Sequence, residues 1–344
     1  MTTMISFDAR HDAEDVVPAP PATEAPTRRR LDALDRFRGA ALVAMLVHHL
    51  CEWLGGDARS VLPGWPDFTL TDLAAPAFFV AAGASCALLV ESRRRRGLSA
   101  VRIAGVVLRR YGLLVPIGMA LAWVLWREPF RFGVLEALGV TVVAAAAVAA
   151  CLPGGLVTVG AAVALWCGVL VERDVTGQTD WAAVQFLGGS FPAITYMGFV
   201  LVGIAAVRSG RFVDRRWTTG AALLGVLAMV ALLADGIIPA RYPGDIGLVV
   251  PGLAGTALVY ALCQLSWPAS LSRVDRLLCQ AATHTFGIFV AHYGLYWVLE
   301  RTGVRGTVDD AVVVPVAIAI AVALCLVARR VPQLPWSLRT GRRR

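Results

Sequence analysis

The stretch LDRFRGAALVAMLVHHLCEW, residues 34–53, combines an apolar run with a dense group of ionisable side chains. After Arg38 it is apolar except for two histidines and one glutamate. A helix of about 20 residues is about 30 Å long, which matches the hydrocarbon core of a bilayer. The stretch therefore predicts a membrane-spanning helix that carries chemically active side chains.

Similar apolar runs recur along the whole chain. Of its 344 residues, 57% are hydrophobic and only 16% are charged, whereas a soluble domain carries about 25% charged residues. This composition excludes a soluble globular protein and predicts an all-α, polytopic bundle of about ten membrane-spanning helices. We expect these helices at residues 33–53, 70–91, 103–126, 133–152, 156–172, 190–208, 217–236, 246–265, 277–299 and 311–329.

The positions of the arginines predict the topology. Basic residues gather in the N-terminal tail, at 93–96, at 208–216 and at 329–344, and such residues favour the cytoplasmic side. Both termini are therefore expected to be cytoplasmic. We expect a disordered tail at 1–30, a membrane domain at 31–331 and a basic tail at 332–344. The net charge of +8 is explained by topology and does not indicate nucleic-acid binding.

Composition also bears on the source of the chain and on metals. The chain contains neither Lys nor Asn, which is typical of a GC-rich bacterial genome and favours a bacterial plasma membrane. Its seven cysteines form no CxxC pair and fall mostly in apolar runs. We interpret them as small buried residues, and we expect no metal site.

The first predicted helix is the strongest candidate for chemistry, since ionisable residues inside a membrane are costly. Arg38 and His49 are eleven residues apart, which is about three helical turns, so both face the same direction about 16 Å apart. Glu52 follows at a spacing that lets it orient either His48 or His49. A cation near the cytosol and a deeper imidazole would suit an anionic substrate and a general base.

Each of these residues also has a structural interpretation. Arg36 and Arg38 could anchor the helix end to lipid headgroups, and His48 is expected to form an interhelical hydrogen bond. Asp72 opens the second helix, where a carboxylate caps free N–H groups. His284 and His292 are eight residues apart, so the two histidines need not share one site.

Several motifs together resemble the heparan-alpha-glucosaminide N-acetyltransferase family and its bacterial relatives. They are the LDRFRG segment from residue 34, Trp65, the DLAAPAFF segment from Asp72 with Gly83 and Ser85, and the segment from Arg131 to Glu136. Arg38 with His49 is also similar to the R-x10-H signature of the acyltransferase-3 family. Both families are polytopic and transfer an acyl group from cytosolic acyl-CoA to an acceptor outside the membrane, usually a sugar.

The resemblance implies acetyl-CoA as the donor, and we expect its phosphates to be bound by Arg36, Arg38, Arg109 and Arg110. The acceptor would be a glycan or small molecule with a hydroxyl or amine. His49, His48, Glu52 and Asp72 are the catalytic candidates. The acceptor-binding candidates are Trp65, Asp35, Arg131, His284 and His292.

One position departs from the family pattern. The lysosomal enzyme has its proposed catalytic histidine three residues before the matched tryptophan, where this chain has Leu62. Either His49 or His48 then supplies the base, or the protein has a different activity. The alternatives are a transporter or lipid-binding membrane protein without covalent chemistry, and another membrane-embedded transferase or cyclase. The sequence leaves the oligomeric state open, a dimer included.

Overall fold

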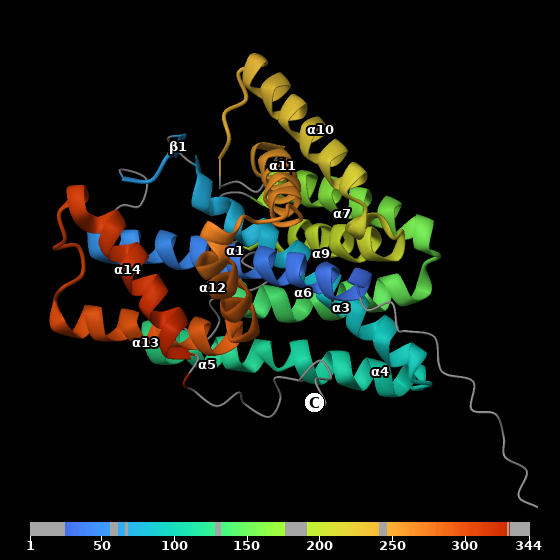
Figure 1. The fold of residues 1–344 in the computed structure, drawn as a ribbon, viewed down its shortest axis with the longest axis horizontal. Helices are drawn as coiled ribbons and strands as arrows, with labels where there is room; N and C mark the ends of the chain where they lie inside the picture. Colours follow the sequence, from blue (N-terminus) through green and yellow to red (C-terminus); the bar gives the residue numbers. More distant parts are fainter. Residues whose placement is uncertain are drawn as a thin grey trace, which may run out of the picture.

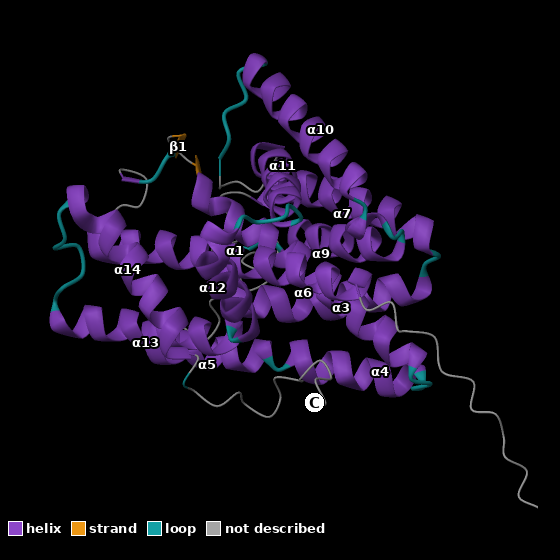
Figure 2. Cartoon of the chain, in the orientation of Figure 1, coloured by secondary structure: helices purple, strands orange, loops and turns teal. Residues whose placement is uncertain are grey.

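A computed structural model describes residues 25–55, 61–65, 68–127, 132–175, 191–240, 246–328 and 330; side chains are not described for 25–31 and 172–175. Helices dominate these residues (Figure 2), as predicted. Their bounds are α1 Ala25–Gly55, α3 Ala74–Arg95, α4 Ala100–Val107, α5 Leu114–Trp126, α6 Val134–Cys151, α7 Gly154–Val175, α9 Ala193–Arg208, α10 Arg215–Ala234, α11 Ile246–Cys263, α12 Ser272–Thr283, α13 Thr285–Thr302 and α14 Asp310–Ala328.

Short elements connect these helices. The strands β1 (Gly64–Trp65) and β2 (Phe68–Thr69) form an antiparallel pair, followed by the 3₁₀ turn η1 (Leu70–Leu73). A π-helical turn, η2 (Leu108–Gly112), joins α4 to α5. Two further 3₁₀ turns are η3 (Arg211–Val213) and η4 (Ala269–Leu271).

Close packing of α3 on α9 forms one half of the core, and glycines make it possible. A Cβ added to Gly83 would lie 2.0 Å from the carbonyl oxygen of Val200, and one added to Gly203 would lie 2.1 Å from that of Val80. The two backbones therefore touch at both positions, which is the role of small residues between membrane helices.

The second half of the core forms around α1, which runs through the middle of the molecule with α12 beside it (Figure 1). The helices α13 and α14 also pack against α1. Buried residues on this side come from α1, α13 and α14 and include Leu46, Ile288 and Val313. By contrast, α10 projects from the bundle (Figure 1) and exposes large apolar side chains such as Leu224 and Leu227.

Among the described residues, seven helices are long and apolar enough to cross a membrane. They are Leu70–Arg95, Ala100–Trp126, Val134–Cys151, Gly154–Val171, Arg215–Ala234, Ile246–Cys263 and Asp310–Ala328. The apolar helix α9 has only 16 residues. At 31 residues α1 is long enough, but its arginines, histidines and glutamate reduce its hydropathy. The count of about ten spans and the cytoplasmic location of both termini remain predictions.

Two boundaries differ from those expected from the sequence. The first helix begins at Ala25, inside the range expected to be a tail; residues 1–24 and the basic tail at 332–344 lie outside the described residues. The single helix predicted at 277–299 is wrong, because α12 ends at Thr283 and α13 starts at Thr285. The hydroxyls of these threonines donate to the carbonyls of Gln280 and Ala282 in the last turn of α12, which satisfies a helix end.

Candidate functional site

The beginning of α1 is attached to α12 by a close backbone contact and by an ion pair. A Cβ added to Gly39 would lie 2.1 Å from the carbonyl oxygen of Leu278, so only glycine allows this contact. Three residues earlier, Arg36 forms a two-point ion pair with Asp275, with Nε–Oδ1 at 2.6 Å and Nη2–Oδ2 at 3.1 Å. The LDRFRG segment therefore fixes α12 against α1.

Arg36 is engaged on every side by protein groups. It also donates to the carbonyl of Cys263 at 3.1 Å and lies over the ring of Trp267 at 5.6 Å. The hydrogen bond from Arg36 holds the pKa of the Asp275 carboxyl below its usual range. The structure thus places Arg36 at the contact between α1 and α12, bound to Asp275 and to the carbonyl of Cys263.

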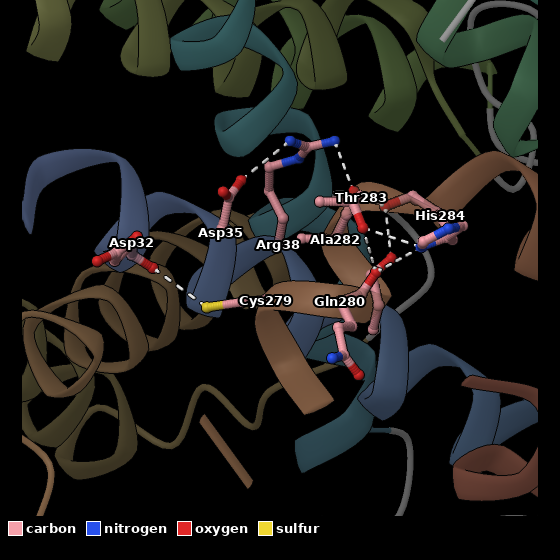
Figure 3. A network of polar contacts seen from close by, with 10 residues as sticks. Asp32, Asp35, Arg38, Cys279, Gln280, Ala282, Thr283 and His284 are labelled. Carbon is pink, nitrogen blue, oxygen red and sulfur yellow. Dashed lines mark hydrogen bonds and ion pairs between the residues drawn. The ribbon is translucent and has the colours of Figure 1, made fainter. Parts of the chain in front are cut away.

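Arg38 binds the end of α12. Its Nη2 donates to the carbonyl of Ala282 at 3.1 Å, and its Nη1 lies 3.4 Å from Asp35 (Figure 3). Arg38 also interacts electrostatically with Arg110 and with the hydroxyl of Tyr111 on η2. Arg38 and Arg110 are two of the arginines predicted to bind phosphate, and Arg109, which precedes Arg110 in the sequence, is exposed.

His284 occupies the junction between α12 and α13 (Figure 3). Its Nδ1 lies 2.9 Å from the hydroxyl of Thr283 and 3.1 Å from the carbonyl of Gln280. Both partners belong to the last turn of α12. His284 therefore contributes to the end of α12. Arg38 contacts the same part of the backbone through the carbonyl of Ala282.

Three turns along α1 from Arg38, His49 contacts α13. Its Nδ1 lies 3.2 Å from Nε2 of His292. The ring planes are nearly parallel, at 12°, and the ring centroids are 5.4 Å apart. His292 is completely buried, at 0% exposure, whereas His49 is partly exposed. Arg38 and His49 therefore both face the α12–α13 pair, as the helical period predicts.

Aromatic rings surround the two imidazoles. Trp53 stacks on both His49 and His292, with centroids at 5.3 and 5.4 Å. The ring centroid of Tyr293 lies 4.3 Å from that of His292 and 5.6 Å from that of Trp126 on α5. The sequence-based prediction missed Trp53, although its position four residues after His49 places it on the same helix face. Aromatic side chains therefore pack around the histidine pair and give it surroundings of low polarity.

His48 belongs to a different polar group at the opening of the second helix. Its Nδ1 lies 2.9 Å from the hydroxyl of Thr71, which is the hydrogen bond between elements that its position predicts. Its Nε2 lies 3.7 Å from Glu52 and 3.9 Å from Asp72. Glu52 is exposed and Asp72 is buried. The structure thus places both predicted carboxylates beside His48.

Asp72 also has the capping role expected of it. One carboxylate oxygen accepts from the backbone N–H and the hydroxyl of Thr69, both at 2.8 Å. These bonds close the turn between β2 and η1. Because the same carboxylate faces His48, Asp72 both shapes this turn and orients an imidazole.

The remaining candidates lie around this turn or beyond the described residues. Trp65 on β1 is partly buried and pairs with Phe68, with ring centroids 6.3 Å apart. Leu62, three residues before Trp65, is buried among residues that include Leu50 and Ala74. Arg131 lies outside the described residues. Within the described part of the chain, no cluster of His, Cys, Asp and Glu could hold a metal ion.

Comparison with known proteins identifies the family. The family model for the catalytic region of heparan-alpha-glucosaminide N-acetyltransferase matches residues 30–233, more than half of the chain. Heparan-alpha-glucosaminide N-acetyltransferase of Mus musculus is 33% identical over 133 residues, a match that covers 35% of this chain and 19% of the mouse protein. The matched region includes α1 and the His48 group. On this evidence the chain belongs to the heparan-alpha-glucosaminide N-acetyltransferase family.

Proposed function

We propose that this protein is a multi-pass membrane acetyltransferase that takes an acetyl group from cytosolic acetyl-CoA. The acceptor would be a hydroxyl or amine of a sugar or small molecule on the opposite side of a bacterial plasma membrane. Family membership supports the reaction class. The observation that carries the proposal is the alignment of Arg38 and His49 toward the α12–α13 pair, through Ala282 and His292.

The donor end would lie at Arg38 and Arg110. The positive charge of Arg110 acts unfavourably on that of Arg38, and the phosphates of CoA would offset this repulsion. Arg109 is exposed next to them and would add a third positive charge. Arg36 is bound by Asp275, so its role would be to hold α12 in place for Arg38.

The acceptor end would lie at the other end of α1. His48, Asp72 and Glu52 offer hydrogen-bond donors and acceptors for a sugar hydroxyl or amine. Trp65 lies on the neighbouring strand, and a partly buried tryptophan suits the apolar face of a sugar ring. Asp35, by contrast, pairs with Arg38 and would serve the donor end.

The reaction would be a single proton-coupled transfer. The acceptor oxygen or nitrogen attacks the thioester carbonyl carbon while Nε2 of His49 takes its proton. The new C–O or C–N bond forms as the C–S bond breaks, and the proton on His49 neutralises the departing CoA thiolate. An acetyl-histidine intermediate is the alternative route to the same products.

The test uses the purified full-length protein in nanodiscs with labelled acetyl-CoA. Amino sugars, neutral sugars and lipid headgroup alcohols serve as acceptors. We expect CoA release that depends on one acceptor class and labelled product in equal amount. Label retained on the protein without acceptor would indicate the acetyl-enzyme route. The proposal would be overturned if the protein neither bound acetyl-CoA nor released CoA with any acceptor.

A further inference from the structure

The hydrogen bonds of His292 determine which of its ring nitrogens carries a proton. Its Nδ1 contacts the carbonyl oxygen of Phe289 in the preceding turn of α13. A carbonyl oxygen only accepts hydrogen bonds, so Nδ1 must be the donor. His292 has 0% exposure, and no acidic residue forms a described contact with it. Because an unpaired charge is costly when buried, its ring is neutral and Nε2 carries a lone pair.

The protonation of His292 determines that of His49. Nδ1 of His49 lies 3.2 Å from Nε2 of His292, and two lone pairs would repel each other at that distance. Nδ1 of His49 must therefore donate its proton to His292. In a neutral His49 this leaves Nε2 unprotonated, which is the state that a general base requires.

We infer that His292 is a positioning residue: through Phe289 it selects the tautomer of His49 whose Nε2 can accept a proton. The inference deepens the proposed function, because it names the group that prepares His49 for acetyl transfer. His49 is the member of the pair that we place against the substrate, because it is partly exposed whereas His292 is fully buried.

The surrounding rings keep this arrangement in place. Trp53 stacks on both imidazoles at angles of 27° and 15°, and Phe289 meets His292 edge to face with centroids 4.9 Å apart. Rotation of His292 would break its ring contacts together with its hydrogen bond to Phe289, and rotation of His49 would break its stacking on Trp53. A buried partner that fixes the proton position of a reactive imidazole works through orientation, as carbonyl and carboxylate partners of histidine do.

The experiment measures the tautomers directly by ¹⁵N NMR of the full-length protein in nanodiscs with ¹⁵N-labelled histidine. The chain has only five histidines, so single substitutions assign each signal. In the wild type we expect protonated Nδ1 and unprotonated Nε2 for both His49 and His292. A proton on Nε2 of His49, or on both nitrogens of His292 at neutral pH, would overturn the inference.

Two variants separate proton placement from packing. His292→Gln can supply a carbonyl oxygen near the former Nε2 and should keep Nδ1 of His49 protonated. His292→Phe fills the space without an acceptor and should give a tautomer mixture at His49, with acetyl transfer reduced about tenfold or more. Trp297→Phe, at an exposed position on α13, is the matched control.

These readouts keep the two proposals apart. If no acetyl transfer is found in any variant, the proposed function fails, but the NMR signals still test the tautomer. If His292→Phe leaves both the His49 tautomer and the transfer rate unchanged, the positioning role is wrong even when the protein is an acetyltransferase.

Discussion

Gly39 of α1 and Leu278 of α12 are in backbone contact, so close that a Cβ on Gly39 would stand 2.1 Å from the Leu278 carbonyl oxygen. This contact lies one residue from Arg38 and three from Arg36. Both arginines also bind α12 or its ends. The LDRFRG segment therefore fixes the distance between α1 and α12. Because α13 follows α12 directly in the chain, this contact also constrains the position of α13.

Gly39→Ala is expected to destabilise the protein by about 1–3 kcal/mol, because the methyl group can be accommodated only by moving the α12 backbone. The melting temperature in detergent measures this. Gly220→Ala on α10 is the control, since a Cβ there meets no atom within 4 Å. Equal melting temperatures for the two variants would contradict the close contact.

Asp275→Asn should reduce stability by about 1 kcal/mol at neutral pH, because it removes the charge paired with Arg36 at a partly exposed site. Asp275 has a lowered pKa in the folded protein. Its stabilisation is therefore complete above the unfolded value of about 3.9 and is lost as the pH falls through the folded value. Melting curves of the variant and the wild type should converge in that acidic range.

Glu91→Gln provides the control for this titration. Glu91 pairs with Arg95 at 2.8 Å, but the side chains are 51% and 77% exposed. Surface pairs of this kind contribute little. A loss of stability in Glu91→Gln equal to that in Asp275→Asn would mean that the Arg36 pair has no special structural role.

Arg38→Gln is expected to raise the KM for acetyl-CoA about tenfold to a hundredfold, because a charged hydrogen bond to phosphate is worth about 1.5–3 kcal/mol. Steady-state kinetics measure the change, and the melting temperature shows whether loss of the Ala282 contact unfolds the protein. Arg102→Gln removes the same charge at an exposed position on α4 and should leave KM unchanged. Identical KM values for Arg38→Gln and the wild type would exclude Arg38 from the donor site.

Asp72→Ala should cost about 1–3 kcal/mol, because the N–H and hydroxyl of buried Thr69 lose their shared acceptor. Asp72→Asn keeps a carbonyl oxygen and should recover part of this loss. Asp235→Ala, which removes an exposed carboxylate after α10, is the control in the same melting assay. If Asp72→Ala melts like the wild type, the capping role is wrong.

The helices were largely predictable, because apolar runs of membrane length identify them without knowledge of tertiary contacts. The break at His284 was not predictable in this way. It depends on Thr283 and Thr285 bonding back to the last turn of α12, whereas the apolar run simply continues through them.

The candidate site was predictable only along a single helix. The period of α1 correctly places Arg38 and His49 on one side. It cannot reveal that His292 is the partner of His49, because this contact joins residues far apart in the sequence. Glu52 could orient either histidine by spacing alone; in the structure it lies near His48, one turn away on α1, and η1 brings Asp72 to the same histidine.

The most direct test of the account compares acetyl transfer by His49→Ala and His48→Ala with that of the wild type at saturating acetyl-CoA. With His49 as the general base, its loss should lower kcat about 10²- to 10⁴-fold while acetyl-CoA still binds. His48→Ala should mainly raise the KM for the acceptor. Full kcat in the His49→Ala protein would contradict the account.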